Sequence, residues 1–262
     1  FACMAAALGT RVTVVEMLED IVMVLDRDVR RVLRKRMETL GVTLLTGAPL
    51  TGIAVKDGTV SGMYKDQAVT GDLLLVAVGR RPNTAALDLA RAGVKVDERG
   101  TIPVDAQGRT NVASIFAVGD LVTGSIQLAH AATQQGVAAA EAAAGMKSAV
   151  EKVCPSCIFT SPEIGLAGLT EAKAQQLGRT VKTAIFPFAA LGKAMAAGET
   201  DGFVKWICDS ATGQVLGAQA VGAHATELIA EAALAIRNEL TVDEVGRTIH
   251  SHPTMSEAWM EA

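Results

Sequence analysis

The first sixteen residues constrain the fold of this chain more than any other segment. The apolar segment FACMAAAL is closed by Gly9, and the β-branched run RVTVVE follows it and ends in Glu16. A helix closed by glycine that leads into a strand with a terminal carboxylate is the second half of a dinucleotide-binding βαβ unit, where the acidic side chain accepts hydrogen bonds from ribose hydroxyls. The glycine loop of such a unit would precede Phe1, so we expect the chain to lack its own N-terminal part. A surface glutamate at an ordinary strand end is the alternative.

The α/β pattern continues to residue 79. The sequence predicts a helix from Asp26 to Leu40 closed by Gly41, a strand VTLLTG, a hairpin IAVKDGTVSGMYK with a Lys-Asp-Gly turn, and a fully apolar, buried parallel strand GDLLLVAVG. The basic stretch DRDVRRVLRKR carries its apolar residues at helical spacing. It is therefore interpreted as the solvated face of that helix.

A different pattern covers residues 80–150. Ile115–Val118 is predicted to be a strand that leads into Gly119 and Asp120, and the alanine-rich helix QLAHAATQQGVAAAEAAAG follows and ends at Gly145. A helix start offers N–H groups and the positive end of its dipole to a phosphate, and an aspartate accepts hydrogen bonds from sugar-like hydroxyls. The segment thus suits a phosphate and polyol site, with a common turn as the other interpretation.

Beyond residue 150 the pattern favours an antiparallel sheet. CIFTSPEIGLAGLT, TVKTAIFPF, FVKWICD and VLGAQAVG are predicted strands, and helices near 171–177 and 225–238 are expected to pack against them. The predicted fold class is an α/β part, made of a partial dinucleotide-binding domain and a further segment, followed by an α+β domain with an antiparallel sheet. The expected divisions are 1–79, 80–150 and 151–262.

Composition excludes several functional classes. Half of the 262 residues are hydrophobic but only 3% are aromatic, which is typical of an α/β protein and not of an aromatic-rich sandwich. A net charge of −4 without a basic stripe argues against nucleic-acid binding. The sequence contains no apolar run long enough for a membrane span, no signal peptide and no secreted disulfide framework, so a cytoplasmic protein without a membrane partner is expected.

The segment HSHPTMSEA near the end of the sequence pairs His252 with Glu257. An imidazole titrates near neutral pH, and a carboxylate on its second nitrogen fixes the tautomer and supports the imidazolium, so the two residues can form an acid–base pair. Pro253 also suits the first position of a helix with Glu257 one turn on. Ordinary helix-start chemistry is therefore the alternative.

Five separated stretches resemble one family, the pyridine nucleotide–disulfide oxidoreductases. TNVASIFAVGD resembles its second flavin-binding signature, GDLLLVAVGRRPN the end of its NAD domain, and HSHPTMSEAWMEA its C-terminal active-site segment. CPSCIFTSPEIGLAG and DGFVKWICDSATGQVLGAQAVG resemble its dimer-interface domain. Within the family, His-Ser-His-Pro-Thr-Met-Ser-Glu looks most like the dihydrolipoamide dehydrogenases. Glu16 favours NAD over NADPH, because a carboxylate repels a 2′-phosphate.

The resemblance implies a flavoenzyme that passes electrons from a dihydrolipoyl dithiol through a disulfide and FAD to NAD. It implies a homodimer formed through the C-terminal domain, in which His252 and Glu257 act as the catalytic acid–base pair across the dimer, and a lipoyl-bearing protein or small dithiol as partner. His250 is expected to be a core or supporting residue. The implied FAD residues are Gly119, Asp120, Gln127, Leu128, Ala129 and His130, and the implied NAD residues are Glu16, Leu50 and Gly79.

Complete members of this family begin with an FAD-binding unit and a C-x-x-x-x-C redox pair, which this sequence does not contain. The resemblance therefore implies a C-terminal part of a larger enzyme, inactive by itself. Another disulfide reductase or a transhydrogenase of the same family is one alternative, and a non-catalytic dimerisation module is another.

Cys154-Pro-Ser-Cys157 has the C-x-x-C spacing of thioredoxin-like redox sites. The family's redox pair has a longer spacer, and the sequence offers no second C-x-x-C or histidine partner for zinc. We expect these two side chains to pack as small apolar groups, and no metal site is predicted.

Overall fold

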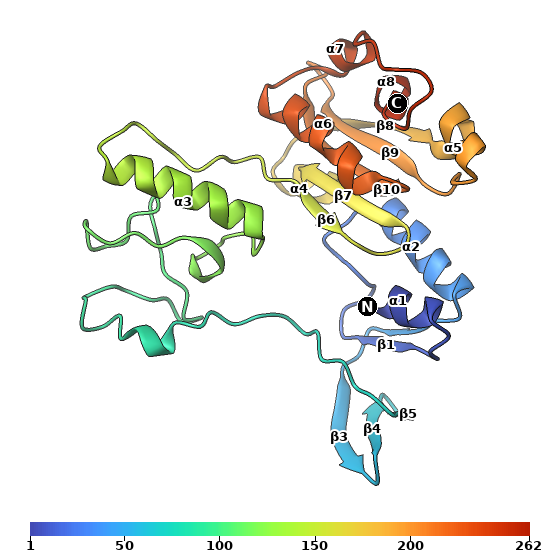
Figure 1. Ribbon diagram of the computed structural model, residues 1–262, viewed down its shortest axis with the longest axis horizontal. Helices are drawn as coiled ribbons and strands as arrows, with labels where there is room; N and C mark the ends of the chain where they lie inside the picture. The colour runs from blue at the N-terminus through green and yellow to red at the C-terminus, as the bar shows by residue number, and fades with distance from the viewer. The chain divides into compact units, whose positions relative to one another are not determined.

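The computed structural model describes all residues, 1–262. It contains two compact units, one formed by Phe1–Leu75 together with Pro155–Ala262 and the other by Val76–Cys154 (Figure 1). None of the helices is both long enough and apolar enough to cross a membrane. The three-part domain division expected from the sequence stays a prediction.

The chain starts with the helix–strand pattern that the sequence indicates. Helix α1 (Ala2–Ala7) precedes strand β1 (Thr13–Glu16), which pairs in parallel with β2 (Thr43–Thr46), and helix α2 (Arg27–Thr39) connects the two strands. Gly9 and Gly41 follow the helices at φ +87° and +79°, a region that L side chains rarely adopt. Helix α2 buries its apolar stripe of Val29, Leu33 and Met37, so the predicted helix is confirmed. Most of its basic face is exposed as expected, but Arg30 and Arg34 are partly buried and pair with Asp20.

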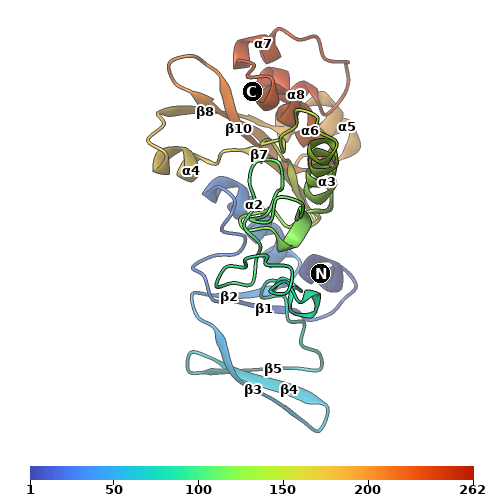
Figure 2. The same cartoon turned by 90° about the vertical axis from the view of Figure 1, so that its left-hand side faces the viewer.

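An antiparallel sheet of three strands follows: β3 (Leu50–Lys56), β4 (Thr59–Tyr64) and β5 (Gln67–Gly71) (Figure 2). The predicted hairpin is confirmed, because Asp57 and Gly58 turn the chain with φ of +50° and +76°, as a two-residue turn with both central residues left-handed requires. Strand β5 was not expected from the sequence, although Lys65 also has a positive φ of +51° at the second turn.

The prediction of a buried parallel strand at GDLLLVAVG is wrong. After Gly71 the chain forms no strand up to residue 79, and Leu73 and Val78 are 88% and 91% exposed. A parallel strand needs a neighbouring backbone for its N–H and C=O groups, and no strand of this chain pairs with the segment. The apolar run correctly indicates a sequence suited to burial but does not supply the partner that would bury it.

The unit Val76–Cys154 is built around one long helix. It contains the short 3₁₀ helices η1 (Ala85–Leu87) and η2 (Gly119–Leu121) and helix α3 (Ala129–Ala143), which Gly145 follows as predicted. The predicted strand Ile115–Val118 is wrong, since only Phe116 makes a single bridge, with Arg109. A small core of Val94, Ile102, Ala117 and Val122 holds the loops together.

The antiparallel sheet expected after residue 150 is confirmed, with strand order β6-β7-β10-β9-β8. Its strands are β6 (Ser156–Ile158), β7 (Glu163–Gly168), β8 (Val181–Pro187), β9 (Phe203–Asp209) and β10 (Val215–Gly222). The helical elements of this part are α4 (Glu171–Gln176), η3 (Phe188–Ala190), α5 (Gly192–Ala197), α6 (Ala225–Arg237), α7 (Val242–Gly246) and α8 (Glu257–Glu261). Figure 1 shows α6 over one face of the sheet and α2 beside the opposite face.

Helix α6 lies close to the sheet because strand β7 carries a glycine beneath it. A Cβ at Gly165 would lie 2.5 Å from the carbonyl oxygen of Ala225 and 2.7 Å from Cβ of Ile229, so no larger residue fits without moving the helix. On the same face, the rings of Trp206 and Trp259 lie 4.3 Å apart, and Trp206 Nε1 donates to the carbonyl oxygen of Trp259. Helix α8 is thereby fixed to the sheet.

The opposite face of the sheet holds a buried charge cluster. The ammonium group of Lys205 on β9 lies 3.2 Å from Asp26 and 2.8 Å from Asp28, and it also contacts Glu171. Burial by itself lowers the pKa of Lys205, but its hydrogen bonds to Asp28 and Glu171 and the charge of Asp26 raise that pKa above its ordinary value. The three carboxylates are close enough to share a metal ion, but the lysine already supplies their positive charge.

We expect Lys205→Met to lower the free energy of unfolding by about 3–5 kcal/mol, because it leaves buried carboxylates without a counter-charge. A group whose pKa is raised on folding stabilises fully below its unfolded pKa and loses this effect only as the pH rises through the folded value. Urea unfolding at pH 7.5 therefore measures the whole contribution. The matched control is Lys182→Met on the neighbouring strand, where the lysine is exposed. Equal stabilities for the two variants would contradict the assignment.

Candidate active site

The loop between α7 and α8 carries His252, and the residue that begins α8 is Glu257. His252 Nδ1 lies 2.8 Å from Glu257 Oε1, with the histidine side chain 78% exposed and the glutamate side chain 13% exposed. The two residues that the sequence pairs are thus in hydrogen-bond contact. Their catalytic role stays a prediction.

Glu257 is held as an ionised acceptor. The backbone N–H of Thr254 donates to Glu257 Oε2 over 2.8 Å. This bond, with the hydrogen bond to His252 and the nearby histidine charges, lowers the pKa of Glu257 below its ordinary value. An ionised carboxylate only accepts hydrogen bonds, so we assign the proton to Nδ1 of His252. Nε2 is then an exposed basic nitrogen with no hydrogen-bond partner in the chain.

The helix-start interpretation of Pro253 is wrong. Helix α8 begins only at Glu257 with Ser256 before it, so Pro253 lies in the loop and not in the first turn. The carboxylate of Glu257 bonds Thr254 and His252, which both precede the helix. Glu257 therefore organises the loop, while Trp259, two residues later, anchors the helix.

His250 has the supporting position that the sequence predicts. Its ring lies against Glu231 on α6, with 2.5 Å between Nε2 and Oε1. Glu231 itself was not found from the sequence. The available signal was one acidic residue within the apolar pattern LIAEAALAI of a helix expected to pack on a sheet.

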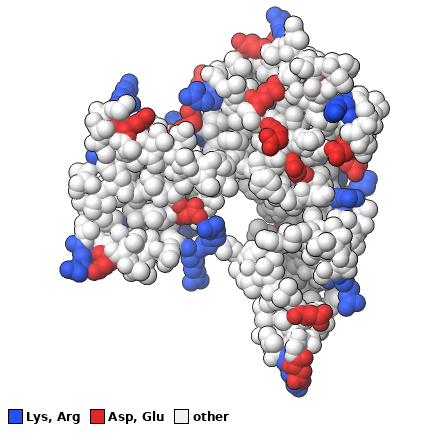
Figure 3. All heavy atoms as spheres, in the orientation of Figure 1, with Lys and Arg blue, Asp and Glu red and all other residues white.

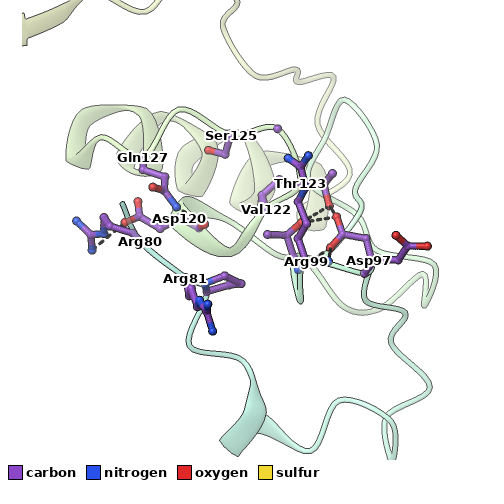
Figure 4. A pocket seen from close by; sticks show the side chains of 13 residues that line it. Arg80, Arg81, Asp97, Arg99, Asp120, Val122, Thr123, Ser125 and Gln127 are labelled. Carbon is purple, nitrogen blue, oxygen red and sulfur yellow. Dashed lines mark hydrogen bonds and ion pairs between the residues drawn. The ribbon is translucent and has the colours of Figure 1, made fainter. Parts of the chain in front are cut away.

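The residues expected to hold FAD lie in the unit Val76–Cys154. Two of them, Asp120 and Gln127, line an open pocket of about 710 Å³ (Figure 4). The pocket is lined by Arg80, Arg81, Pro82, Asp97, Glu98, Arg99, Thr101, Asp120, Val122, Thr123, Gly124, Ser125 and Gln127. Asp120 pairs with Arg80 at 3.1 Å. Hydrogen bonds, chiefly from Thr101, lower the pKa of Asp97 to about 2, so this carboxylate stays ionised in the pocket wall.

The other expected FAD residues are near the pocket in sequence but do not line it: Gly119, Leu128, Ala129 and His130. Gly119 has φ +83°, and its N–H donates over 2.6 Å to Gln135 on α3, which seats the turn against the helix. Helix α3 begins at Ala129 without a side-chain cap. An uncapped helix start close in sequence to the partly exposed Asp120 fits a pyrophosphate group joined to a chain of hydroxyls.

The residues expected to bind NAD occupy separate positions. Glu16 ends β1, and its carboxylate accepts a hydrogen bond from the N–H of Leu18 over 2.8 Å, which leaves its remaining acceptor sites for ribose hydroxyls. Leu50 begins β3 and packs on Gly62, where a Cβ would lie 2.9 Å from Leu50 Cγ. Gly79, with φ +114°, belongs to the other compact unit. Their binding roles stay predictions.

The two cysteines of the C-x-x-C segment are not activated thiols. Burial raises the pKa of Cys154, and burial together with the charges of Glu163 and Glu227 raises the pKa of Cys157. A redox thiol needs a lowered pKa. These directions agree with the expectation that both side chains pack as small apolar groups.

We expect Cys154 and Cys157 to react with iodoacetamide at pH 7.5 more slowly in the folded chain than in the urea-unfolded chain, because their thiolate fractions are smaller. Mass spectrometry of timed samples measures each rate. Cys208, whose pKa burial raises to about 11, serves as the slow internal reference. Faster modification of the folded chain at either cysteine would restore the redox interpretation.

On the face that Figure 3 shows, acidic and basic side chains are interspersed and do not form a basic stripe.

Comparison with known proteins adds independent information. Residues 1–136 match the family model for pyridine nucleotide-disulphide oxidoreductases, and residues 154–262 match the model for the dimerisation domain of that family. The dihydrolipoyl dehydrogenase of Haloferax volcanii is 45% identical over 98% of the chain and 55% of the relative. That of Chlamydia pneumoniae is 43% identical over 100% of the chain and 57% of the relative.

Solved structures of flavoprotein disulfide reductases and related proteins are also similar to this chain over its whole length. LpdA from Mycobacterium tuberculosis superimposes with a TM-score of 0.93 at 30% identity, covering 100% of this chain and 57% of that protein. The HOCl-induced flavoprotein disulfide reductase RclA from Escherichia coli has a TM-score of 0.91 at 28% identity, covering 100% of this chain and 60% of that protein. The chain spans a little over half the length of the relatives it matches.

Proposed function

Because the chain belongs to the pyridine nucleotide-disulphide oxidoreductase family, we propose that it forms the part of a dihydrolipoyl dehydrogenase that carries the acid–base pair. In this function, electrons pass from a dihydrolipoyl dithiol through a disulfide and FAD to NAD. The observation that carries the proposal is the contact of His252 with Glu257, which leaves a basic nitrogen exposed next to an ionised, anchored carboxylate.

His252 performs the proton transfer in this proposal. Its Nε2 accepts the proton of a substrate thiol as the S–H bond breaks, and the sulfur keeps the electron pair as a thiolate. Glu257 stabilises the resulting imidazolium through Nδ1–H and returns the ring to the same tautomer after each turnover. In the reverse direction, the imidazolium returns its proton to a thiolate. Protonation of one ring nitrogen thus serves both directions near neutral pH.

We also propose the cofactor residues that the resemblance to the family implies. Asp120, Gly119 and Gln127, with the uncapped start of α3 at Leu128, Ala129 and His130, would hold the ribityl and pyrophosphate groups of FAD. From the same resemblance, Glu16 is proposed to bind the adenine ribose of NAD, and Leu50 and Gly79 are proposed as further NAD residues. When bound, FAD supplies the electron transfer between the dithiol and the nicotinamide. The residues of this chain would bind and orient the cofactors, and His252 would exchange the proton with the substrate.

The proposed partners follow from the same assignment. The match of residues 154–262 to the dimerisation domain supports a homodimer, in which each His252 serves the disulfide and flavin of the other subunit. A lipoyl-bearing protein or a small dithiol is the proposed substrate. A cytoplasmic location stays an expectation from composition.

A second candidate is another disulfide reductase of the family, favoured by the similarity to RclA. A transhydrogenase of the family or a non-catalytic dimerisation module is a more distant alternative. A panel of dithiol and disulfide substrates, assayed with NAD and NADPH, separates the first two candidates.

We expect His252→Gln to lower dithiol-dependent NAD reduction by roughly 10²–10⁴-fold, the usual contribution of a general acid–base residue. Glu257→Gln should lower it less, because the imidazole remains but loses the charge that supports its protonated form. The measurement is steady-state turnover in the full-length natural protein, of which residues 1–262 form a part. Flavin absorbance per chain checks that the variants keep their cofactor.

The double variant Cys154→Ser/Cys157→Ser is the matched control, and its turnover should stay nearly unchanged. A fall in its turnover equal to that of His252→Gln would assign the redox chemistry to these cysteines. Full turnover in His252→Gln would refute the acid–base assignment.

A further inference from the structure

The loop that carries His252 has one inward-facing residue between exposed neighbours. His250 has a side chain that is only 6% exposed, whereas Ile249 is 95% exposed and the side chain of His252 is 78% exposed. The loop lies outside any helix or strand, so the backbone ladders of regular structure do not hold it. Its shape must come from side-chain contacts and from the hydrogen bonds at its two ends.

His250 is bound at both ring nitrogens. Nδ1 lies 2.8 Å from the carbonyl oxygen of Thr248, and Nε2 lies 2.5 Å from Oε1 of Glu231. Thr248 belongs to the same loop, whereas Glu231 belongs to helix α6, which packs on the five-stranded sheet. His250 thereby joins the loop to the most extensively packed helix of this part of the chain.

The two contacts determine where the protons lie. A carbonyl oxygen can only accept, so Nδ1 carries a hydrogen. Nε2 faces a carboxylate oxygen, so a second proton must lie between these two atoms for the contact to be favourable. The His250–Glu231 pair is therefore a charge-assisted hydrogen bond, shielded from water on the histidine side. Such a contact is shorter and more directional than a contact between neutral groups.

A second set of contacts fixes the other end of the same loop. Thr254 donates its hydroxyl to the carbonyl oxygen of Ser251 over 2.6 Å and its N–H to Glu257 over 2.8 Å. Ser251 is the one residue between His250 and His252. The backbone on the N-terminal side of His252 is thus held to α6, and the backbone on its C-terminal side is held to α8.

We propose that Glu231 and His250 are positioning residues for His252: their contact holds the loop so that the outward-facing imidazole meets Glu257 through Nδ1 and presents Nε2. The inference rests on the proposed function for its catalytic meaning. The positioning itself is a property of this chain and can be measured without turnover.

The charge of His250 supports the same arrangement. After the Thr254 N–H bond and the contact with His252, the positive charge of His250 is a further cause that lowers the pKa of Glu257. The charged groups around His250 are therefore Glu231 from α6 and Glu257 from α8, with His252 on the same loop. Removing the charge of Glu231 alters this group of four without touching the contact between His252 and Glu257.

The test compares Glu231→Gln and His250→Asn with Glu227→Gln, a control one turn earlier on the same helix where the side chain is exposed. The chain has four histidines, so ¹⁵N-histidine labelling gives few ring signals, and a His252→Gln sample assigns those of His252. The ¹⁵N shifts report which ring nitrogen carries the proton. In the unaltered chain we expect His252 to be protonated at Nδ1 when neutral.

In Glu231→Gln and His250→Asn we expect the His252 signals to shift toward the Nε2-protonated form, while Glu227→Gln leaves them unchanged. In the full-length natural protein, the same two variants should lose about 10–100-fold in dithiol turnover, the loss seen when the partner that orients a functional imidazole is removed from a metal site. Their KM for NAD and their flavin content should not change.

Unchanged His252 ¹⁵N shifts in a folded Glu231→Gln chain would overturn the proposal. Glu231→Gln nearly preserves the side-chain shape, so it carries the test if His250→Asn does not fold. Failure of Glu231→Gln itself to fold would overturn the proposal too, because the pair would then serve the fold and not His252. Absence of dithiol turnover in the unaltered protein would refute the proposed function, whereas the ¹⁵N result would still decide the positioning.

Discussion

The part of the structure formed by residues 1–75 and 155–262 depends on the contact of Lys205 with three carboxylates. A buried ammonium group is costly to desolvate unless its charge is neutralised and its hydrogen bonds are satisfied. Asp26 and Asp28, at the start of α2, meet this requirement together with Glu171. Nε2 of Gln219 donates to the Asp26 carboxylate over 2.7 Å, and Oε1 of Gln219 accepts from the backbone N–H of Asp26 over 3.1 Å. The start of α2 is therefore held on the sheet by directional contacts, and the apolar residues of α2 complete the interface.

Strand β9 contributes to the packing on both faces of the sheet, through Lys205 on one face and Trp206 on the other. Successive side chains of a strand point to opposite faces. Lys205 therefore faces α2, and Trp206, the next residue, faces α8 and α6. The indole of Trp206 donates to the carbonyl of Trp259, and the indole of Trp259 donates to the carbonyl of Leu228 on α6 over 3.0 Å. A shift of register by one residue would move the lysine into the tryptophan layer, so the charge cluster and the tryptophan pair fix the same register.

Sequence patterns predicted the helices and turns of this fold better than they predicted which segments pair with one another. Gly9, Gly41 and Gly145 marked the ends of helices because a left-handed cap is a local property, and the Lys-Asp-Gly turn fixed a hairpin for the same reason. GDLLLVAVG failed as a strand because pairing depends on a second backbone, which a local pattern cannot reveal. The contacts of Lys205 with Asp28 and of His250 with Glu231 span 177 and 19 residues of sequence. His252 and Glu257 could be paired beforehand because they lie five residues apart.

The two histidine–carboxylate pairs near the end of the sequence, His250–Glu231 and His252–Glu257, differ in how much they contribute to the stability of the fold. The ring of His250 is buried, so its contact with Glu231 also contributes to stability, because breaking it would leave a polar group without water or partner. The ring of His252 is exposed, and exposed ion pairs contribute about 0–1 kcal/mol. Water could satisfy both of its nitrogens equally well. Yet Glu257 is anchored by Thr254, on a helix held by a buried tryptophan, with its pKa lowered so that it stays an acceptor. Fixing one nitrogen of an exposed imidazole adds little to stability, and its consequence is a defined base at the other nitrogen.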